Sequence, residues 1–304
     1  MSSYFAYSSD GHTWTKKIAP TAGAWEGVIY GGGLFLAFNG SAQCATSSDG
    51  VNWSLTYGLE KFGTGAYGVG TSGGMYVATT SGVGPNQLAC SSDASTWHII
   101  TPPITTQYLS KVAFGSGLFV ALADYNTNFI TSPDGVTWTE QNPGPGGLSI
   151  AFSNLVYNGT NFVAMANDGG ILLSSNGITW TSPTTPPLWS GTSQVYALAS
   201  NGSTVAAQNN ATSSPSNVVG YSATGDSWTM ATMPTADLWS AVGHGVGTYV
   251  AVSTGVDGAY GGPSSWTAMT MPVSQAWTGV AGNASVVVAV GSGAGAPNGI
   301  IMMP

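Results

Sequence analysis

Carboxylates are the side chains of this sequence best suited to acid and base chemistry. The glutamates and the aspartates in apparent loops are Glu26, Glu60, Glu140, Asp124, Asp168, Asp237 and Asp257. Cleavage of a glycosidic bond needs two carboxyl groups that face each other across that bond. The three glutamates fall in distant segments, and no loop aspartate has an evident carboxylate partner. We therefore predict no catalytic residue and no enzyme activity.

Residues that could bind a metal ion are also scattered. His12, His98 and His244 belong to separate segments and are not expected to converge on one ion. The oxygen-rich stretches 124–128 and 168–170 could bind calcium, which prefers hard oxygen ligands, although stretches of this composition are more often plain turns. The sequence thus predicts no cofactor and no metal centre, with calcium left open.

Charged residues are rare in this chain of 304 residues. They make up 5% of it, against 43% apolar residues, and the net charge is -8. The cations are lysines without any arginine, so counterion release, which drives nucleic-acid binding, has little to act on. No apolar run has the ~20 residues of a membrane span, and the N-terminus carries no export signal. We expect no nucleic-acid binding and no membrane insertion, and we expect Cys44 and Cys90 to be buried thiols rather than a disulfide.

A short motif that ends in tryptophan recurs along the chain. Clear copies read SSDGHTW, SSDGVNW and SPDGVTW, and the copies end at Trp14, Trp53, Trp97, Trp138, Trp180, Trp228 and Trp266. Successive tryptophans are separated by 39, 44, 41, 42, 48 and 38 residues, which is the period of a β-propeller blade. A helical solenoid of similar period is excluded, because no window has helical apolar spacing and the 44 glycines and 16 prolines interrupt the chain.

Each motif is expected to form the turn between the third and fourth strands of a blade. Asp-Gly is a strong hairpin signal because glycine accepts a positive φ, and the Asp and Ser oxygens can accept the N–H groups of the turn. Apolar runs such as 117–122 and 247–252 predict second strands that are buried on both faces. The tryptophan supplies a large apolar surface for packing between blades.

These turns resemble a compact form of the Asp-box, S-x-D-x-G-x-x-W, of BNR or sialidase-like β-propellers and photosystem-assembly-factor-like propellers. The resemblance covers nearly the whole chain and weakens where Ala94 replaces Gly, where Asn176 replaces Asp, and in the last two copies. It implies a structural role, away from the active face, for Asp10, Gly11, Trp14, Asp49, Gly50, Trp53, Asp93, Trp97, Asp134, Gly135, Trp138, Gly177, Trp180, Trp228 and Trp266. Sialidase activity is excluded, because that family binds its substrate's carboxylate with an arginine triad that lysine cannot replace.

The fold predicted for residues 1–304 is a single all-β domain, a seven-bladed β-propeller with four antiparallel strands per blade. The chain begins with a motif hairpin, YFAYSSDGHTW, and ends with an apolar segment, WTGVAGNASVVVAVG, followed by NGIIMMP. Pairing of these N- and C-terminal segments in one blade would close the ring and remove open sheet edges. Either YFAY or GIIMM can serve as the third strand of that blade.

One rim of this propeller carries short repeated turns, and the opposite rim carries the variable connections. Variable loops on a rigid scaffold are the usual place for binding. There we expect a binding site drawn from Trp25, Tyr108, Trp189, Trp239, Trp277, Asp124, Tyr125, Asp257 and Tyr260. The aromatic rings would stack on sugar rings or dock a partner protein. The alternative is that they plug the channel or pack against neighbouring blades.

Composition, repeat and resemblance together predict a binding or structural propeller that acts outside a cell. The compact repeat is similar to that of bacteriophage propellers, so the leading hypothesis is a virion component, such as a tail-fibre, receptor-binding or capsid-decoration module. Its partners would be other virion proteins or a host-surface glycan or receptor, and its location the virion or the extracellular space. A carbohydrate-binding lectin and an assembly factor that docks a partner protein are the alternatives.

Overall fold

Every regular element that the structure describes is a β-strand. The computed structural model describes residues 3–39, 43–56, 66–80, 88–104, 109–123, 128–142, 152–166, 170–183, 194–203, 205–210 and 216–292. Its strands form antiparallel sheets of neighbouring segments. Six of these sheets have four strands, and one has three.

Each sheet runs outward from an innermost strand. From that strand outward, the first three sheets are β3 (Trp25–Gly31), β4 (Leu34–Asn39), β5 (Cys44–Ser47), β6 (Ser54–Thr56); β7 (Ala66–Ser72), β8 (Met75–Thr80), β9 (Leu88–Ser91), β10 (His98–Ile100); and β11 (Leu109–Gly115), β12 (Leu118–Ala123), β13 (Phe129–Ser132), β14 (Thr139–Gln141). The three-stranded sheet is β15 (Phe152–Tyr157), β16 (Phe162–Ala166), β17 (Ile171–Ser174). The remaining sheets are β18 (Gln194–Ser200), β19 (Val205–Asn210), β20 (Ser216–Ser222), β21 (Thr229–Asp237); β22 (Trp239–Gly245), β23 (Thr248–Ser253), β24 (Asp257–Gly262), β25 (Ser265–Thr270); and β26 (Ala276–Gly282), β27 (Val287–Ser292), β1 (Tyr4–Ser8), β2 (Thr15–Ile18).

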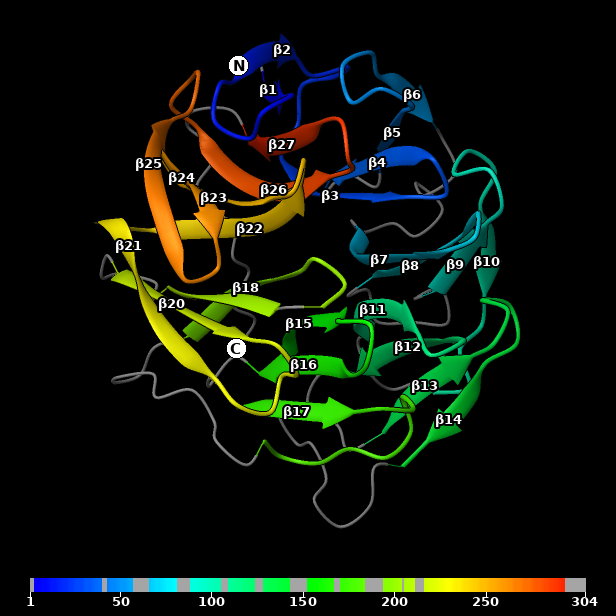
Figure 1. Cartoon of the computed structure of the whole chain (residues 1–304). Helices are drawn as coiled ribbons and strands as arrows, with labels where there is room; N and C mark the ends of the chain where they lie inside the picture. The colour runs from blue at the N-terminus through cyan, green and yellow to red at the C-terminus, as the bar shows by residue number, and fades with distance from the viewer. Residues whose placement is uncertain are drawn as a thin grey trace.

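The sheets stand side by side around a common axis, with the first strand of each nearest the axis (Figure 1). These innermost strands contact one another in a closed cycle that runs from β3 through β7, β11, β15, β18, β22 and β26 back to β3. The chain is therefore a β-propeller with four-stranded antiparallel blades. In the β15–β17 sheet, an isolated bridge between Leu173 and Thr181 lies where a fourth strand would pair with β17.

The core of the molecule lies between the blades, because the second strands whose burial is described are largely buried on both faces. In β12, for example, every residue from Phe119 to Ala123 is at most 2% exposed. Alternate side chains of a strand point to opposite faces. Phe119 accordingly packs with Val77 of the preceding blade, and Val120 packs with Phe162 of the following blade. The apolar second strands predicted from the sequence thus fasten each blade to both neighbours.

The N- and C-terminal segments complete one blade. β1 pairs with β27 from Phe5 opposite Val290 to Ser8 opposite Val287, and β2 pairs with the other edge of β1. The predicted ring closure is confirmed, with YFAY of β1 as the third strand of this blade. The alternative segment GIIMM lies outside the described residues.

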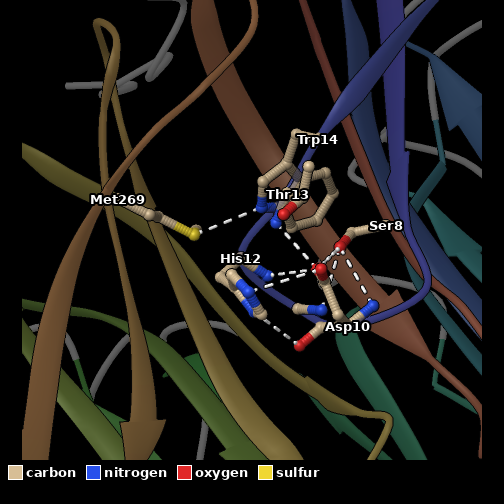
Figure 2. A network of polar contacts seen from close by, with 7 residues as sticks. Ser8, Asp10, His12, Thr13, Trp14 and Met269 are labelled. Carbon is tan, nitrogen blue, oxygen red and sulfur yellow. Dashed lines mark hydrogen bonds and ion pairs between the residues drawn. The ribbon is translucent and has the colours of Figure 1, made fainter.

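Six of the seven motif copies form a turn whose Ser, Asp, Asn or Thr side chains bond to the turn's own backbone. In the first copy, Asp10 Oδ1 accepts the N–H groups of His12 at 2.9 Å and Thr13 at 2.7 Å, as well as the hydroxyl of Ser8 (Figure 2). Ser8 Oγ in turn accepts the N–H of Gly11 at 2.9 Å. The donors and acceptors of this turn are therefore satisfied locally, as its predicted structural role requires.

Later copies repeat this bonding pattern with only small changes. The N–H groups of Thr137 and Val136 bond to the Asp134 carboxylate and lower its pKa to about 2. Asn176 replaces Asp in the fifth copy, and its Oδ1 accepts the N–H groups of Ile178 and Thr179, each at 2.9 Å. A negative charge at this position is therefore not essential to the turn.

The motif tryptophans pack between two blades, as predicted. Trp14 Nε1 donates to Met269 Sδ of the preceding blade at 3.2 Å (Figure 2). The Trp53 ring meets Phe5 of the preceding blade edge-on, with ring centroids 4.9 Å apart. Cys44 and Cys90 are both buried and form no disulfide with each other.

Candidate functional site

The three tryptophans that were expected to line the binding rim are buried. Trp25, Trp239 and Trp277 are each 0% exposed, because each lies at the start of an innermost strand and packs into an apolar cluster between blades. Phe5, for instance, meets Trp25 edge-on with ring centroids 5.0 Å apart. The prediction that these rings stack on a ligand is therefore wrong, and the alternative of packing against neighbouring blades describes them.

The remaining aromatic and loop residues proposed for the site do not form one cluster in the described structure. Tyr260 of β24 stacks on His12 of the adjacent blade, with ring centroids 5.0 Å apart and an interplanar angle of 24°. This ring therefore belongs to a contact between blades. Four of the five other proposed residues lie outside the described residues: Tyr108, Trp189, Asp124 and Tyr125.

Asp257 is exposed at the start of β24, close to Asp237 at the end of β21. Partial burial, a hydrogen bond with Asp237 and the negative charge of Asp237 raise the pKa of Asp257. Asp237 Oδ1 also accepts the N–H of Leu238 at 2.6 Å. β21 and β24 are the fourth and third strands, counted from the innermost strand, of two neighbouring blades (Figure 1).

Every innermost strand carries a β-bulge next to its start. Its pairing with the second strand shifts by one residue there in each sheet. The residues that the bulges insert, which have no paired residue on the second strand, are Glu26, Tyr67, Ser110, Ser153, Tyr196, Ser240 and Thr278. A bulge bends its strand and changes the direction of a side chain. The ring of bulges marks the rim where the variable connections enter the innermost strands, which we call the loop rim; the rim of motif turns is the motif rim.

Two bulged residues connect neighbouring blades. The Ser240 hydroxyl donates to the carbonyl oxygen of Trp277 at 2.5 Å, and the Thr278 hydroxyl donates to that of Trp25 at 2.5 Å. Each bond crosses from one innermost strand to the next. In the following blade the equivalent position is Glu26, whose carboxyl group can donate such a bond only when it is protonated.

A central cavity of about 490 Å³ lies between the innermost strands. At its bulged end the polar lining residues are Glu26, Lys111, Asn154, Ser240 and Thr278, which we call the channel mouth. The next level is lined by small and aliphatic residues that include Ile29, Ala113, Val156, Ala199 and Ala281. The channel therefore has a polar mouth above an apolar neck.

The channel mouth combines a titratable carboxyl group with an ammonium group. Glu26 on β3 and Lys111 on β11 are both half-buried. Burial raises the pKa of Glu26 to about 7, and the positive charge of Lys111 acts in the opposite direction. A carboxyl group with this pKa can exchange a proton near neutral pH, which is a property of binding and catalytic sites.

The opposite end of the channel has phenol, hydroxyl and imidazole groups in place of the carboxyl and ammonium groups of the mouth. Its lining includes Tyr30, Thr71, Tyr157, Ser200 and His244. His244 lies 5.0 Å from Tyr249, measured between ring centroids, and burial lowers the pKa of this histidine. Here the Tyr76 hydroxyl donates to the carbonyl oxygen of Gly31 in the neighbouring blade at 2.8 Å. This bond joins two neighbouring blades at this end of the channel.

Within the described ranges, no three His, Cys, Asp or Glu side chains converge as metal ligands would. Of the two stretches considered for calcium, 124–128 and 168–170, only Asn128 and Gly170 are described. Asn128 Nδ2 donates to Glu140 Oε1. The described part of the chain also has no helix with the length and apolar character of a membrane span.

Solved structures match the chain by shape, although no protein-family model and no curated protein sequence matches it. The structure of streptogramin B lyase matches this chain with a TM-score of 0.71 at 9% sequence identity. The match covers 94% of this chain and 97% of the lyase. The structure of catalytically inactive virginiamycin B lyase from Staphylococcus aureus with quinupristin matches with a TM-score of 0.72 at 11% sequence identity. This match covers 94% of this chain and 99% of the lyase. The structure of YCF48 bound to D1 peptide matches with a TM-score of 0.63 at 10% sequence identity. This match covers 90% of this chain and 93% of YCF48. Identities this low establish the β-propeller fold alone.

These matches correct one prediction made from the sequence. We predicted that the chain is not an enzyme, but structures that superpose on 94% of it include enzymes, the streptogramin B and virginiamycin B lyases. The propeller fold is therefore compatible with catalysis, and the scatter of carboxylates along the sequence does not exclude it.

Sequence reasoning also missed the residues of the channel mouth. Glu26 was considered only as a glutamate without a carboxylate partner, and Lys111 only as one of the lysines of the chain. Both are charged residues on the innermost strands β3 and β11, and the innermost strands contain no other Lys, Arg, Asp or Glu. That contrast is the signal that could have identified them.

Proposed function

We propose that this chain is a binding propeller of a bacteriophage virion, with seven blades of which the β15–β17 sheet is one. It engages other virion proteins or a host-surface glycan or receptor through the loop rim. The ligand or partner covers the channel mouth, and the protein works at the virion surface or in the extracellular space. The near absence of ionised surface groups and the closed ring are consistent with a module that must remain folded outside a cell.

The difference between the two rims carries this proposal. On the motif rim, the oxygens of Ser8 and Asp10 and of their counterparts are bonded within their own turns. At the loop rim, Glu26, Lys111 and Asn154 line a cavity of about 490 Å³. Cavities of this size, with a few polar groups over an apolar lining, are typical of ligand sites. The loop rim therefore has the groups needed to bind another molecule.

Two structural neighbours add support. YCF48 is described with a bound D1 peptide, and a virginiamycin B lyase is described with quinupristin. The mouth residues also differ from blade to blade: Glu26, Lys111, Asn154, Ser240 and Thr278. Different residues around the ring favour one composite site over a set of equivalent sites. This favours a single receptor or partner over a lectin that binds one sugar per blade.

Purified particles test the virion assignment. Mass spectrometry and immunogold labelling of particles from the source of this gene should detect the chain. Labelled protein should adsorb to host cells, and Lys111→Ala should weaken adsorption while Val136→Ser, which changes an exposed valine of the motif rim, should not. Absence of the chain from particles would overturn the virion assignment. Binding of several glycan equivalents per chain on an array would favour the lectin, and capture of one cellular protein would favour the assembly factor.

A further inference from the structure

The channel mouth carries one charge of each sign, and the two charges act on each other. Glu26 on β3 and Lys111 on β11 are the acidic and the basic residue of the innermost strands. The positive charge of Lys111 favours the ionised form of the Glu26 carboxyl group. A ligand with a net charge is attracted by one of these residues and repelled by the other, and its charge also loses water on entry. The mouth is therefore better suited to an uncharged ligand.

Hydrogen bonds within the protein decide which atoms of the channel mouth remain for a ligand. The Ser240 and Thr278 hydroxyls each donate to a main-chain carbonyl oxygen of the next innermost strand, so their lone pairs remain as acceptors. With the Glu26 carboxylate, they place acceptors on three consecutive innermost strands, β22, β26 and β3. Asn154 on β15 is different, because its Oδ1 accepts the N–H of Leu155 at 2.9 Å and its amide nitrogen adds a donor. A fitting ligand therefore has several donors on one side and an acceptor on another.

The apolar neck begins beside the Asn154 donor. Asn154 and Val156 both line the channel, and residues two positions apart share a face of a strand. Ala113 of the neighbouring strand β11 lines the neck with Val156. A ligand acceptor bonded to Asn154 is therefore best followed, deeper in the channel, by a small apolar group. An acetamido group has this combination, since its carbonyl carbon carries a methyl group.

We propose that the channel mouth binds one N-acetylated hexosamine unit of a glycan. Ring hydroxyls of the sugar donate to the acceptors on β22, β26 and β3, the acetamido carbonyl oxygen accepts from Asn154, and the acetamido methyl group enters the neck. Hydroxyl groups form stronger hydrogen bonds with an ionised carboxylate than with a neutral acceptor. This inference rests on the proposed function, because it names the chemical class of the host-surface glycan that the loop rim engages.

Simple sugars test this ligand class on the full chain at pH 7. The probes are N-acetylglucosamine, N-acetylgalactosamine and N-acetylmannosamine, and at least one should bind with one equivalent per chain in isothermal titration calorimetry. Its acetamido methyl group should receive the strongest saturation transfer from the protein in NMR. The matched hexose, hexosamine and hexuronic acid lack the acetamido group or carry a net charge, and each should bind at least fivefold more weakly. The proposal is overturned if none of the three probes binds, if a charged sugar binds as tightly, or if N-acetylalanine amide binds more tightly, which would assign the mouth to peptides.

Variants assign the parts of the sugar to the residues of the mouth. Asn154→Leu should weaken binding of the best probe at least tenfold, and Glu26→Gln, which removes the charge of one acceptor, at least threefold. Ala113→Phe fills the neck and should weaken the N-acetylated sugar more than the matched hexose. Val136→Ser, on the motif rim, is the control and should bind as the wild type does, with circular dichroism verifying the fold of each variant. Unchanged binding in both Asn154→Leu and Glu26→Gln would overturn the site.

Adsorption to host cells separates this inference from the proposed function. If none of the probes binds to protein that still adsorbs to host cells, the ligand class is refuted and the proposed function stands. If a probe binds as described but the protein neither adsorbs nor occurs in particles, the proposed function is refuted and the sugar site stands.

Discussion

The motif glycine has two separate roles. Gly135 has a φ of +77°, which residues with a side chain rarely adopt. A Cβ at this position would also lie 3.0 Å from Met75 Cγ and 3.0 Å from Val77 Cγ2, both in the preceding blade. The glycine thus permits the turn and allows the turn to approach its neighbour. The third copy has Ala94 instead, at a φ of 56°.

Gly135→Ala should therefore destabilise the protein by about 2 kcal/mol, because it combines a left-handed backbone with overpacking. Chemical denaturation followed by tryptophan fluorescence measures this change. The matched control is Ala94→Gly, which should alter stability by less than about 1 kcal/mol, since relief of the positive φ offsets the lost methyl group and the added backbone entropy. Equal stability of wild type and Gly135→Ala would show that the turn does not constrain the fold.

The motif aspartates predict a specific response to acid. Backbone N–H bonds hold the pKa of Asp93 and Asp134 at about 2, below the ordinary value of 3.8, and the same bonds lower the pKa of Asp49. A carboxyl group whose pKa is lower in the folded chain stabilises the fold at pH values above its ordinary pKa. This contribution is lost as the pH falls toward the folded-state pKa. Asn176 shows that asparagine accepts the same backbone bonds.

Substituting these three aspartates with asparagine should cost little stability at pH 7. The free energy of unfolding should then fall less steeply than in the wild type between about pH 4 and pH 2. Urea unfolding at half-unit pH steps measures both curves. Parallel curves would mean that the turn carboxylates have the same pKa in the folded and unfolded chains.

At the scale of elements, the bulged start of the innermost strand holds neighbouring blades together. Thr278→Val keeps the shape of the side chain but leaves the carbonyl oxygen of Trp25 without the hydroxyl that bonds it at 2.5 Å. Loss of such a buried bond costs about 1 to 2 kcal/mol. Thr278→Ser retains the hydroxyl and should keep most of the wild-type stability in thermal unfolding. If the valine and serine variants melt together, the hydrogen bond between blades is not a source of stability.

Glu26 occupies the same bulge position and makes the innermost strand sensitive to pH. Its folded-state pKa is raised to about 7 by burial. When the pKa of a carboxyl group is raised in the folded chain, its contribution to stability is fully present at pH values below its ordinary pKa of 4.5. This contribution is lost as the pH rises to about 7. The wild type should therefore lose stability relative to Glu26→Gln between pH 4.5 and pH 7. A constant difference in free energy of unfolding across that range would contradict the raised pKa.

The elements that the sequence predicted are those whose signals are local. The Asp-Gly turn, its tryptophan and the apolar second strands are each encoded within a few residues, and the structure places them as predicted. The bulges are not local, because they follow from the register between two strands. Trp25, Trp239 and Trp277 were misplaced for this reason: their burial depends on which side of the bulged strand they occupy, and spacing along the chain does not determine that.

At the scale of the whole molecule, ring closure makes the N-terminal hairpin part of the core. Phe5 and Ala6 are each 1% exposed, and β27, which pairs with β1, is buried. The sequence predicted this closure because the last apolar segment lacked a motif of its own. The channel mouth could not be predicted in the same way, since Glu26 and Lys111 are far apart in the chain and line the same cavity only once the ring is formed.

Deletion of residues 1–18 should open the ring. The edge of β27 would be exposed, and an unpaired apolar edge strand promotes association between chains. Size-exclusion chromatography should show oligomers or aggregates for this variant, and a synthetic peptide of residues 3–18 should restore the monomer. A monomeric deletion variant with unchanged thermal stability would show that the terminal pairing is dispensable.

Pairing of β1 with β27 also has a consequence for synthesis on the ribosome. β1 leaves the ribosome first among the strands, but its partner follows only after residue 286 has been added. At about 5 to 20 residues per second this delay lasts tens of seconds. During that time the nascent chain can stack its other blades in order, while Tyr4–Ser8 waits with one edge unpaired. Closure of the ring thus cannot precede the synthesis of β27, and a cell that makes many copies at once must keep these waiting strands from pairing with one another.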